Sequence, residues 1–313
     1  IEAGEPQKAI EIFNRAIKAD PTFALPHWNL ALALLESGQW HQAWDEYEYG
    51  FDCKMRIDRG LIIAGKPRWN GTPGKTVAIY GEQGLGDEIM FASMIPEVLK
   101  TNNVVIECHT RLKTLFEKAF PGVPCYGVRE DKEISWPQNH NIDYQISIAS
   151  LGKFYRRSLD AFPGTPYLKA DSAPRTNDKF RIGLSWTGGQ KAGRVRKRTV
   201  PLSWWKTILN NIGCEFISLQ YTDCDDEIHL MESMGYEIKQ FPEIKAHDYY
   251  ETAKLVKSCD LVISVCTSVV HLAGALGVPC WCMTPDFPAW RYQNSGRMPW
   301  YRSVRLYRQN PND

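Results

Sequence analysis

From residue 76 onward the sequence alternates short apolar runs with segments of helical period, and this alternation constrains the fold more than any other feature. Thr76–Tyr80, 104–108 and 144–148 are predicted strands, and 112–120 is a predicted helix between two of them. Short apolar runs separated by helices are typical of a parallel sheet that is covered on both faces. This first series predicts a doubly wound domain, in which ligands bind beyond the carboxyl ends of the strands.

A second series of the same kind follows residues 163–179, a stretch rich in Pro, Thr, Asn and Asp. Its predicted strands are 181–186, 215–220, 260–265 and 278–283, and its predicted helices are 201–211, 225–234, 247–258 and Ser268–Leu276. We therefore expect an α/β protein with two doubly wound lobes, 67–170 and 171–313. A cleft between two such lobes would suit an enzyme with two substrates.

The first 66 residues carry an internal repeat. The segment that begins at Gly4 recurs at Gly38. At that shift of 34 residues Ala9 aligns with Ala43, and the apolar residues between the copies share one helical face. This period resembles that of the tetratricopeptide (TPR) family. Since about three repeats are usually needed for stability, we expect either a chain cut from a longer protein, which we favour, or helices that lie against the next domain.

The composition excludes several classes of protein. Lys plus Arg number 37 and Asp plus Glu 36, so the net charge of +1 gives no general attraction to nucleic acid or membrane. No uncharged run reaches the roughly 18 residues that a transmembrane helix needs. The nine cysteines contain no CxxC pair, which favours reduced thiols in a cytoplasmic protein. We expect no nucleic-acid partner and no transmembrane segment, so any anion-binding site must be local.

The glycine-rich loop 81–87 follows the first predicted strand of the first lobe. Gly84 and Gly86 allow the backbone to turn sharply and approach a ligand, and the next helix offers free N–H groups. The spacing is GxxGxG rather than the GxGxxG of dinucleotide-binding loops, so it matches a nicotinamide site only weakly. Asp87 stands at the helix start, where two interpretations remain open: a helix cap, or a general base.

A cationic loop ends the first predicted strand of the second lobe. Trp186 is followed by Gly-rich sequence, and five of the eight residues 191–198 are Lys or Arg, including Lys191 and Arg198. Clustered cations beside glycines at the end of a strand suit a diphosphate. The alternative is a charged loop that is simply solvated.

A third candidate joins the apolar strand 260–265 to the next helix. Thr267 and Ser268 fall where the helix start would present hydroxyls and free N–H groups to an anion. Helix capping is the alternative for both residues. His271 lies one turn further on, where a lone histidine can also be a packed, hydrogen-bonded group.

Together, segments 81–91, 182–201 and 260–283 and the tail 285–309 resemble the heptosyltransferase-like glycosyltransferases, particularly their bacterial TPR-fused branch. The resemblance implies the GT-B fold: two Rossmann-like doubly wound lobes, 67–170 for the acceptor and 171–313 for the donor, after an all-α TPR segment, 1–66. It implies a metal-independent inverting glycosyltransferase without cofactor. Such an enzyme moves a sugar from a nucleotide-diphosphate donor to a hydroxyl of a glycan or protein, which the TPR segment would dock.

Carried over residue by residue, the resemblance makes Asp87 the general base. The donor-binding residues that it implies are Gly84, Gly86, Trp186, Lys191, Arg198, Gln220, Thr267, Ser268 and His271. One position departs from the family, which usually has Asp where this chain has Cys266. That departure supports an alternative hypothesis, a catalytically decayed TPR scaffold that only binds a nucleotide or a protein partner.

Overall fold

The computed structural model describes residues 5–56, 63, 65–129, 131, 134–189, 198–293 and 295–310. The chain forms two compact units. Unit 1 comprises residues 1–163 and 289–294, and unit 2 comprises residues 164–288 and 295–313. A short piece of the C-terminal region therefore belongs to the N-terminal unit, and the chain passes from one unit to the other three times.

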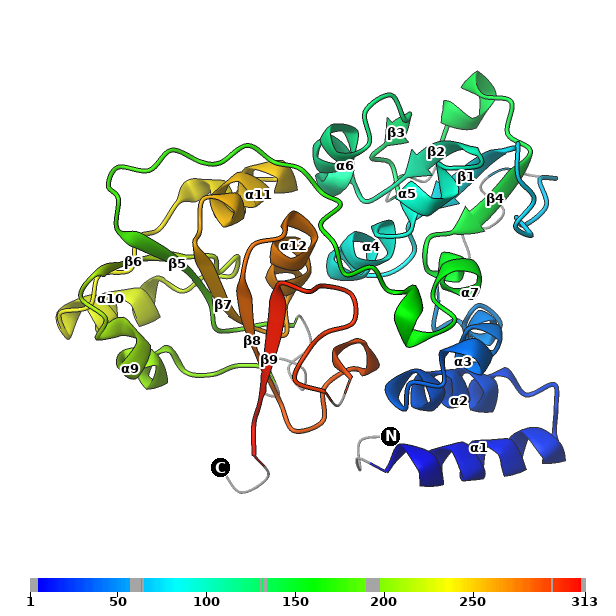
Figure 1. Cartoon of the computed structure of the whole chain (residues 1–313), viewed down its shortest axis with the longest axis horizontal. Coiled ribbons are helices and arrows are strands. Elements are labelled where there is room, and N and C mark those ends of the chain that lie inside the picture. Colours follow the sequence, from blue (N-terminus) through cyan, green and yellow to red (C-terminus); the bar gives the residue numbers. More distant parts are fainter. Residues whose placement is uncertain are drawn as a thin grey trace. The chain divides into compact units, whose positions relative to one another are not determined.

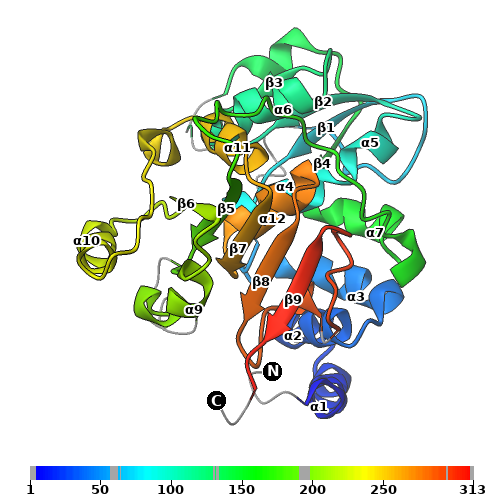
Figure 2. The same cartoon turned by 60° about the vertical axis from the view of Figure 1, so that its left-hand side comes forward.

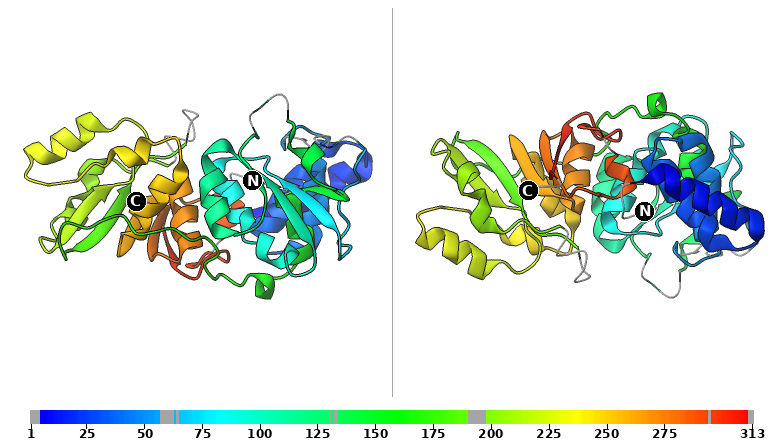
Figure 3. Two further views of the ribbon diagram at one scale, coloured as in Figure 1. Left: turned by 90° about the horizontal axis from the view of Figure 1, so that it is seen from above. Right: turned by 90° about the horizontal axis from the view of Figure 1, so that it is seen from below.

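Unit 1 begins with three helices, α1 (Pro6–Ala19), α2 (Ala24–Glu36) and α3 (Trp40–Tyr47), followed by the 3₁₀ turn η1 (Glu48–Gly50). α1 packs on α2 and α2 on α3, with α1 outermost (Figures 1 and 3). No residue of α1 is buried, whereas Leu34, Trp40 and Trp44 are almost fully buried. The helices expected from the repeat are present, and their membership in the TPR family stays a prediction.

The sheet of unit 1 is parallel throughout and has the strand order β3-β2-β1-β4. Its strands are β1 (Thr76–Tyr80), β2 (Asn103–Glu107), β3 (Cys125–Tyr126) and β4 (Tyr144–Ser147). Its helices and 3₁₀ turns are α4 (Leu85–Ala92), α5 (Ile95–Val98), η2 (Thr110–Leu112), α6 (Lys113–Ala119), η3 (Trp136–Asn139), η4 (Ala149–Leu151), α7 (Gly152–Tyr155), η5 (Leu159–Ala161) and η8 (Trp290–Tyr292). Ala78 and Val105 pack with Trp136 and Ile142 in its core.

The sheet of unit 2 is also parallel and has the strand order β6-β5-β7-β8-β9. Its strands are β5 (Phe180–Ser185), β6 (Cys214–Ser218), β7 (Leu261–Val265), β8 (Cys280–Thr284) and β9 (Val304–Arg308). Its helices and 3₁₀ turns are η6 (Leu202–Trp205), α9 (Lys206–Leu209), α10 (Asp225–Ser233), η7 (Pro242–Lys245), α11 (Tyr249–Lys257) and α12 (Ser268–Leu276). Every residue of β7 is buried, whereas the edge strand β9 alternates between buried and exposed residues.

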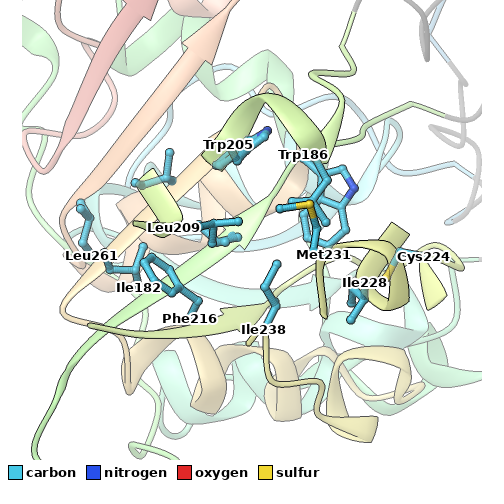
Figure 4. Close-up of a cluster of buried hydrophobic side chains, with 13 residues drawn as sticks. Ile182, Trp186, Trp205, Leu209, Phe216, Cys224, Ile228, Met231, Ile238 and Leu261 are labelled. Carbon is cyan, nitrogen blue, oxygen red and sulfur yellow. The ribbon is translucent and has the colours of Figure 1, made fainter. Parts of the chain in front are cut away.

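Helices cover both faces of this second sheet. The connections from β5 to β6 and from β7 to β8 run in opposite directions across the sheet, and right-handed crossovers then place their helices on opposite faces. α9 and α10 lie on one face and α11 and α12 on the other (Figures 1 and 2). Under α9 and α10, Ile182 and Phe216 of the sheet pack against Leu209 and Met231 (Figure 4).

The predicted α/β class and the two parallel sheets are confirmed. The single helix expected over 201–211 is wrong, because the chain there forms η6 and then the short helix α9. β3 and β9 were not predicted. The helices α1 to α3 and the first sheet lie together in unit 1, and the finer division into 1–66, 67–170 and 171–313 stays a prediction. Among the described residues, no helix is both long and apolar enough to span a membrane.

Candidate functional site

The glycine-rich loop of unit 1 connects β1 to α4. Gly81 has no space for a side chain, because a Cβ atom there would overlap the carboxyl group of Glu88. Gly84 occupies the N-cap position of α4, and its carbonyl accepts hydrogen bonds from the N–H groups of Asp87 at 2.9 Å and Glu88 at 3.0 Å. Asp87 is therefore the third residue of the helix, and the interpretation of Asp87 as its cap is wrong. Gly86 is the second residue, in the first turn.

The Asp87 carboxylate pairs with an arginine from the far end of the sequence. Arg291 Nη2 donates to Asp87 Oδ1 at 2.5 Å, across 204 residues of chain. The two side chains are 16% and 21% exposed for Arg291 and Asp87, respectively. The candidate base thus keeps some contact with solvent, while one of its oxygens is fixed.

Trp290 anchors the segment that carries Arg291. It is 8% exposed, and its ring centroid lies between 6.0 and 6.5 Å from those of four aromatic residues. These are Trp40, Trp44, Tyr47 and Phe91. The first three belong to α3 and the last to α4. The helical segment (α1 to α3) and the helix that follows the glycine-rich loop therefore share one aromatic cluster with residues 289–293.

Arg56 ties the helical segment to the same loop. Its guanidinium, fully buried, donates to both carboxylate oxygens of Glu82, at 3.1 and 3.2 Å. It also donates to Glu48 at 2.9 Å and to the hydroxyls of Ser147 and Ser150, each at 2.8 Å. Burial raises the pKa of Glu82 to about 7, and the charge of Arg56 acts in the opposite direction. The second residue of the loop is therefore held by a buried ion pair.

A second buried carboxylate supports the other side of the loop. Glu88 accepts from the backbone N–H of His109 at 2.9 Å. Arg129 bonds both to this carboxylate and to the carbonyl of Gln83. Burial raises the pKa of Glu88 to about 7, and Arg129 again acts against that shift. The loop 81–84 is thus fixed by buried charges on both sides, despite its glycines.

None of these supporting residues was predicted from the sequence. Glu82 lies in the predicted loop and Glu88 directly follows it, and two acids beside a buried strand are a signal that they need cationic partners. Arg56, Arg129 and Arg291 carry no comparable local signal, since each reaches the loop from a distant part of the chain.

In unit 2 the loops after β5 and β6 are joined by the side chain of Gln220. Its Oε1 accepts from the backbone N–H groups of Trp186 at 3.2 Å and Thr187 at 3.1 Å. Its Nε2 donates to the carbonyl of Thr187 at 3.0 Å and to Thr222 at 2.7 Å. With 1% of its surface exposed, Gln220 lies where it shapes the loop rather than where it contacts a ligand directly.

Trp186 was predicted to bind the donor, and the structure places its side chain in the core of unit 2. The ring is 0% exposed and lies with Ile228 and Met231 of α10 (Figure 4). Its Nε1 donates to Glu227 at 2.8 Å. The ring is therefore enclosed by protein and supports the loop, and its role in donor binding stays a prediction.

The cationic loop returns to the strand end where it began. Gly188 N–H donates to the carbonyl of Arg198 at 3.1 Å, and Arg198 Nη1 donates to the carbonyl of Cys266 at 3.4 Å. A Cβ atom at Gly188 would lie 2.6 Å from Thr267 Cγ2, so only glycine allows this close approach. Arg198 thus lies beside the start of α12. Lys191 and the cations at 194, 196 and 197 lie outside the described residues.

Thr267 caps α12, with its hydroxyl accepting from the N–H of Val269 at 3.2 Å. Ser268, which follows, accepts from the hydroxyl of Tyr249 at 2.9 Å. His271 is 4% exposed, with Nδ1 3.3 Å from the hydroxyl of Tyr301, so it lies inside the unit. Thr267, Ser268 and Arg198 are therefore brought together at the positive end of a helix dipole, whereas His271 is a packed group.

This arrangement suits an anion more than a metal ion. A helix N-terminus and an adjacent guanidinium both favour negative charge. Within the described ranges, no group of three or more His, Cys, Asp or Glu side chains is placed to hold a metal ion. The assignment of the ten predicted residues to catalysis and donor binding, and the absence of a metal requirement, stay predictions.

No family model matches the chain. It is 30% identical over 338 residues to Protein FlbA of Caulobacter vibrioides, an alignment that covers 98% of this chain and 56% of FlbA. The chain thus spans about half the length of that relative.

Among solved structures, it resembles a family 9 glycosyl transferase from Veillonella parvula, with 12% identity, a TM-score of 0.55, and 76% and 86% of this and that chain covered. ADP-heptose LPS heptosyltransferase II of E. coli matches with 12% identity, a TM-score of 0.50, and coverage of 75% and 91%. E. coli heptosyltransferase WaaC with ADP matches with 10% identity, a TM-score of 0.50, and coverage of 76% and 94%. These likenesses show the fold: the chain has the GT-B architecture of the heptosyltransferases, as predicted.

Proposed function

We propose that the protein is a nucleotide-sugar glycosyltransferase that transfers a sugar to an acceptor hydroxyl with inversion, without a metal ion or cofactor. The observation that carries the proposal is Asp87, a partly exposed carboxylate at the start of α4, on a loop fixed by Glu82 and Glu88. The heptosyltransferase fold supports the same activity. The helices α1 to α3 are the proposed docking surface for the acceptor, a glycan or a protein.

The proposed roles are those of a base, Asp87, and of an anion-binding group, Arg198 with the start of α12. The Asp87 carboxylate takes the proton of the acceptor hydroxyl as its oxygen attacks the anomeric carbon. The bond from that carbon to the diphosphate breaks, and the electron pair leaves with the nucleoside diphosphate. Arg198 and the N-terminus of α12 stabilise the developing negative charge. Lys191 would add to this stabilisation, and Gln220 holds the loop in place.

Two measurements test the activity. A thermal-shift screen of ADP, UDP, GDP and their sugars identifies the donor, because a ligand at about 100 times its dissociation constant stabilises by about 2.7 kcal/mol. Nucleotide release, measured by mass spectrometry with a cell extract as acceptor, then gives the turnover.

Asp87→Asn should lower turnover by roughly 10²–10⁴ and leave donor affinity nearly unchanged. Asp45→Asn is the matched control, since Asp45 also forms an ion pair in unit 1, with Lys153 at 2.9 Å. Full turnover in Asp87→Asn would exclude Asp87 as the base.

Cys266 supports the second candidate function, a decayed scaffold that only binds. The residue is 2% exposed, and its thiol lies 3.8 Å from the carbonyl of Met283. A thiol accepts hydrogen bonds from sugar hydroxyls only weakly. If the protein is an enzyme with a changed donor, Cys266→Asp should shift its donor preference. If it is a scaffold, no donor in the panel is consumed, and Cys266→Asp does not restore turnover.

A further inference from the structure

The two oxygens of the Asp87 carboxylate have different surroundings. Oδ1 accepts from Arg291 at 2.5 Å. Oδ2 lies near Gly84, and a Cβ atom added to that glycine would stand only 3.1 Å from Oδ2. One oxygen is thus held by a guanidinium, while the other lies beside a residue that has no side chain to cover it.

The segment that carries Arg291 is itself held by its neighbours Trp290 and Gln293. Its guanidinium carbon lies 5.6 Å from the centroid of the Trp290 ring, which the aromatic cluster of α3 and α4 encloses. Gln293 Nε2 donates to the carbonyl of Leu35 at 2.8 Å and to that of Trp290 at 2.5 Å.

The backbone of Gln293 has φ of 51°, a left-handed conformation that costs a non-glycine residue of order 1–3 kcal/mol. A backbone in that region persists only where its surroundings over-determine it. The surroundings here are the helical segment, through the carbonyl of Leu35, and the caged ring of Trp290. The position of Arg291 is therefore a product of the fold around it.

We propose that Arg291 is a positioning residue for Asp87, and this inference rests on the proposed function. By binding Oδ1, the guanidinium fixes the rotamer of Asp87 and leaves Oδ2 to receive the proton of the acceptor. Arg291 keeps its own protons, since a guanidinium offers only donors and does not titrate in proteins. Without this partner, a partly exposed Asp side chain samples other staggered rotamers. The helical segment, which encloses Trp290, thereby takes part in setting the geometry of the base.

The kinetic test compares Arg291→Ala, Arg291→Lys and the control Arg175→Ala. Arg175 forms a similar ion pair, 3.0 Å from Asp260 in unit 2. Arg291→Ala should lower kcat by about ten- to a hundredfold with an unchanged donor KM, the scale of a misplaced catalytic group. Added guanidinium should restore kcat several-fold in Arg291→Ala and have no such effect on Arg175→Ala. Unchanged kcat in Arg291→Ala overturns the proposal, as does a loss that neither guanidinium nor Arg291→Lys reverses.

Hydrogen exchange tests the pair without reference to activity. The N–H groups of Tyr292 and Gln293 are bonded to the carbonyls of Ala289 at 3.0 Å and Trp290 at 3.1 Å. Asp87→Asn and Arg291→Ala should each speed exchange at these two amides several-fold, and the double variant should add nothing. No change in Asp87→Asn would mean that the pair is absent in solution, and the proposal falls whatever the donor assays show. If the pair is present but the protein consumes no donor, the proposed function is refuted, and Arg291 is then only a structural contact.

Discussion

Replacing Arg56 by methionine removes the cation of a buried ion pair and keeps most of its apolar volume. Arg56 has no exposed side-chain surface, and neither does its partner Glu82. Glu48 keeps 26% of its side chain exposed and can be solvated when the arginine is gone. The variant therefore leaves one carboxylate buried without a countercharge, directly in the loop that leads to Asp87.

The expected loss follows from that isolated carboxylate. Removing one partner of a buried pair costs about 3–5 kcal/mol, which is a factor of about 10²–10³ or more in the local opening equilibrium at roughly 1.4 kcal/mol per tenfold. The stability of the variant should also depend on pH. Burial raises the pKa of Glu82 above that of an unfolded chain even with Arg56 present, and the uncharged side chain of the variant no longer opposes that shift. The folded variant then binds more protons than the unfolded chain between about pH 4.5 and 7, so its stability rises as the pH falls through that window.

Hydrogen exchange reports the opening of unit 1 separately from that of unit 2, so it suits the measurement of this loss of stability. The N–H of Ile148 donates to the carbonyl of Tyr80 at 2.8 Å, next to the β1–β4 pairing, and reports opening of this sheet. Arg157→Met is the matched control, because the Arg157–Asp45 pair at 3.4 Å is partly exposed and such pairs contribute about 0–1 kcal/mol. A loss below about 1 kcal/mol in Arg56→Met at pH 7, or a variant whose stability does not rise between pH 7 and pH 5, would refute this account of the pair.

Three further outcomes are expected. Glu88→Gln should remove part of a pH-dependent loss of stability. Burial raises the folded pKa of Glu88 to about 7 from 4.5, so this group alone costs the wild type up to about 3 kcal/mol as the pH rises through that range. The pKa of Glu82 is raised in the same direction, so the urea midpoint of the variant should still fall, but by less than that of the wild type, and an equal fall in both would contradict this. Trp290→Ala should destabilise unit 1 by about 3–5 kcal/mol, the range for aromatic truncation in a core; unchanged amide protection in α3 would contradict this. Arg198→Ala should weaken nucleoside diphosphate binding by about 1.5–3 kcal/mol in calorimetry, and unchanged affinity would mean that the loop is merely solvated.

Buried strands and their helices were predictable because their sequences are continuous apolar runs. β1 was predicted with its observed bounds, and α12 as well. β9 was missed because an edge strand is covered on one side only, and its Val-Arg-Leu-Tyr-Arg sequence alternates instead of forming a run. β3 has two residues, too few for any periodic signal. The helix over 201–211 failed because its first turn is 3₁₀, which residue type alone does not indicate.

The loops of the candidate site were predictable, and the contacts of their side chains were not. The glycines of 81–87 and 187–189 marked places where the backbone turns closely. The resemblance assigned Trp186 to donor binding, and the structure places its side chain under α10, a direction that the sequence does not indicate. The Asp87–Arg291 pair joins residues 204 positions apart, and no local pattern encodes a contact that only tertiary packing creates.

The excursion of residues 289–294 into unit 1 limits how these units can be exchanged between related proteins. Recombination at one point, after residue 163, would transfer 164–313 as one piece and remove Trp290 from the aromatic cluster of its original partner. A foreign first unit would receive a tryptophan that its own helices were not shaped to enclose. Chimeras that exchange unit 2 should therefore fold properly only when residues 289–294 come from the parent of unit 1. The junctions on either side of 289–294 then matter as much for inheritance as the one after residue 163.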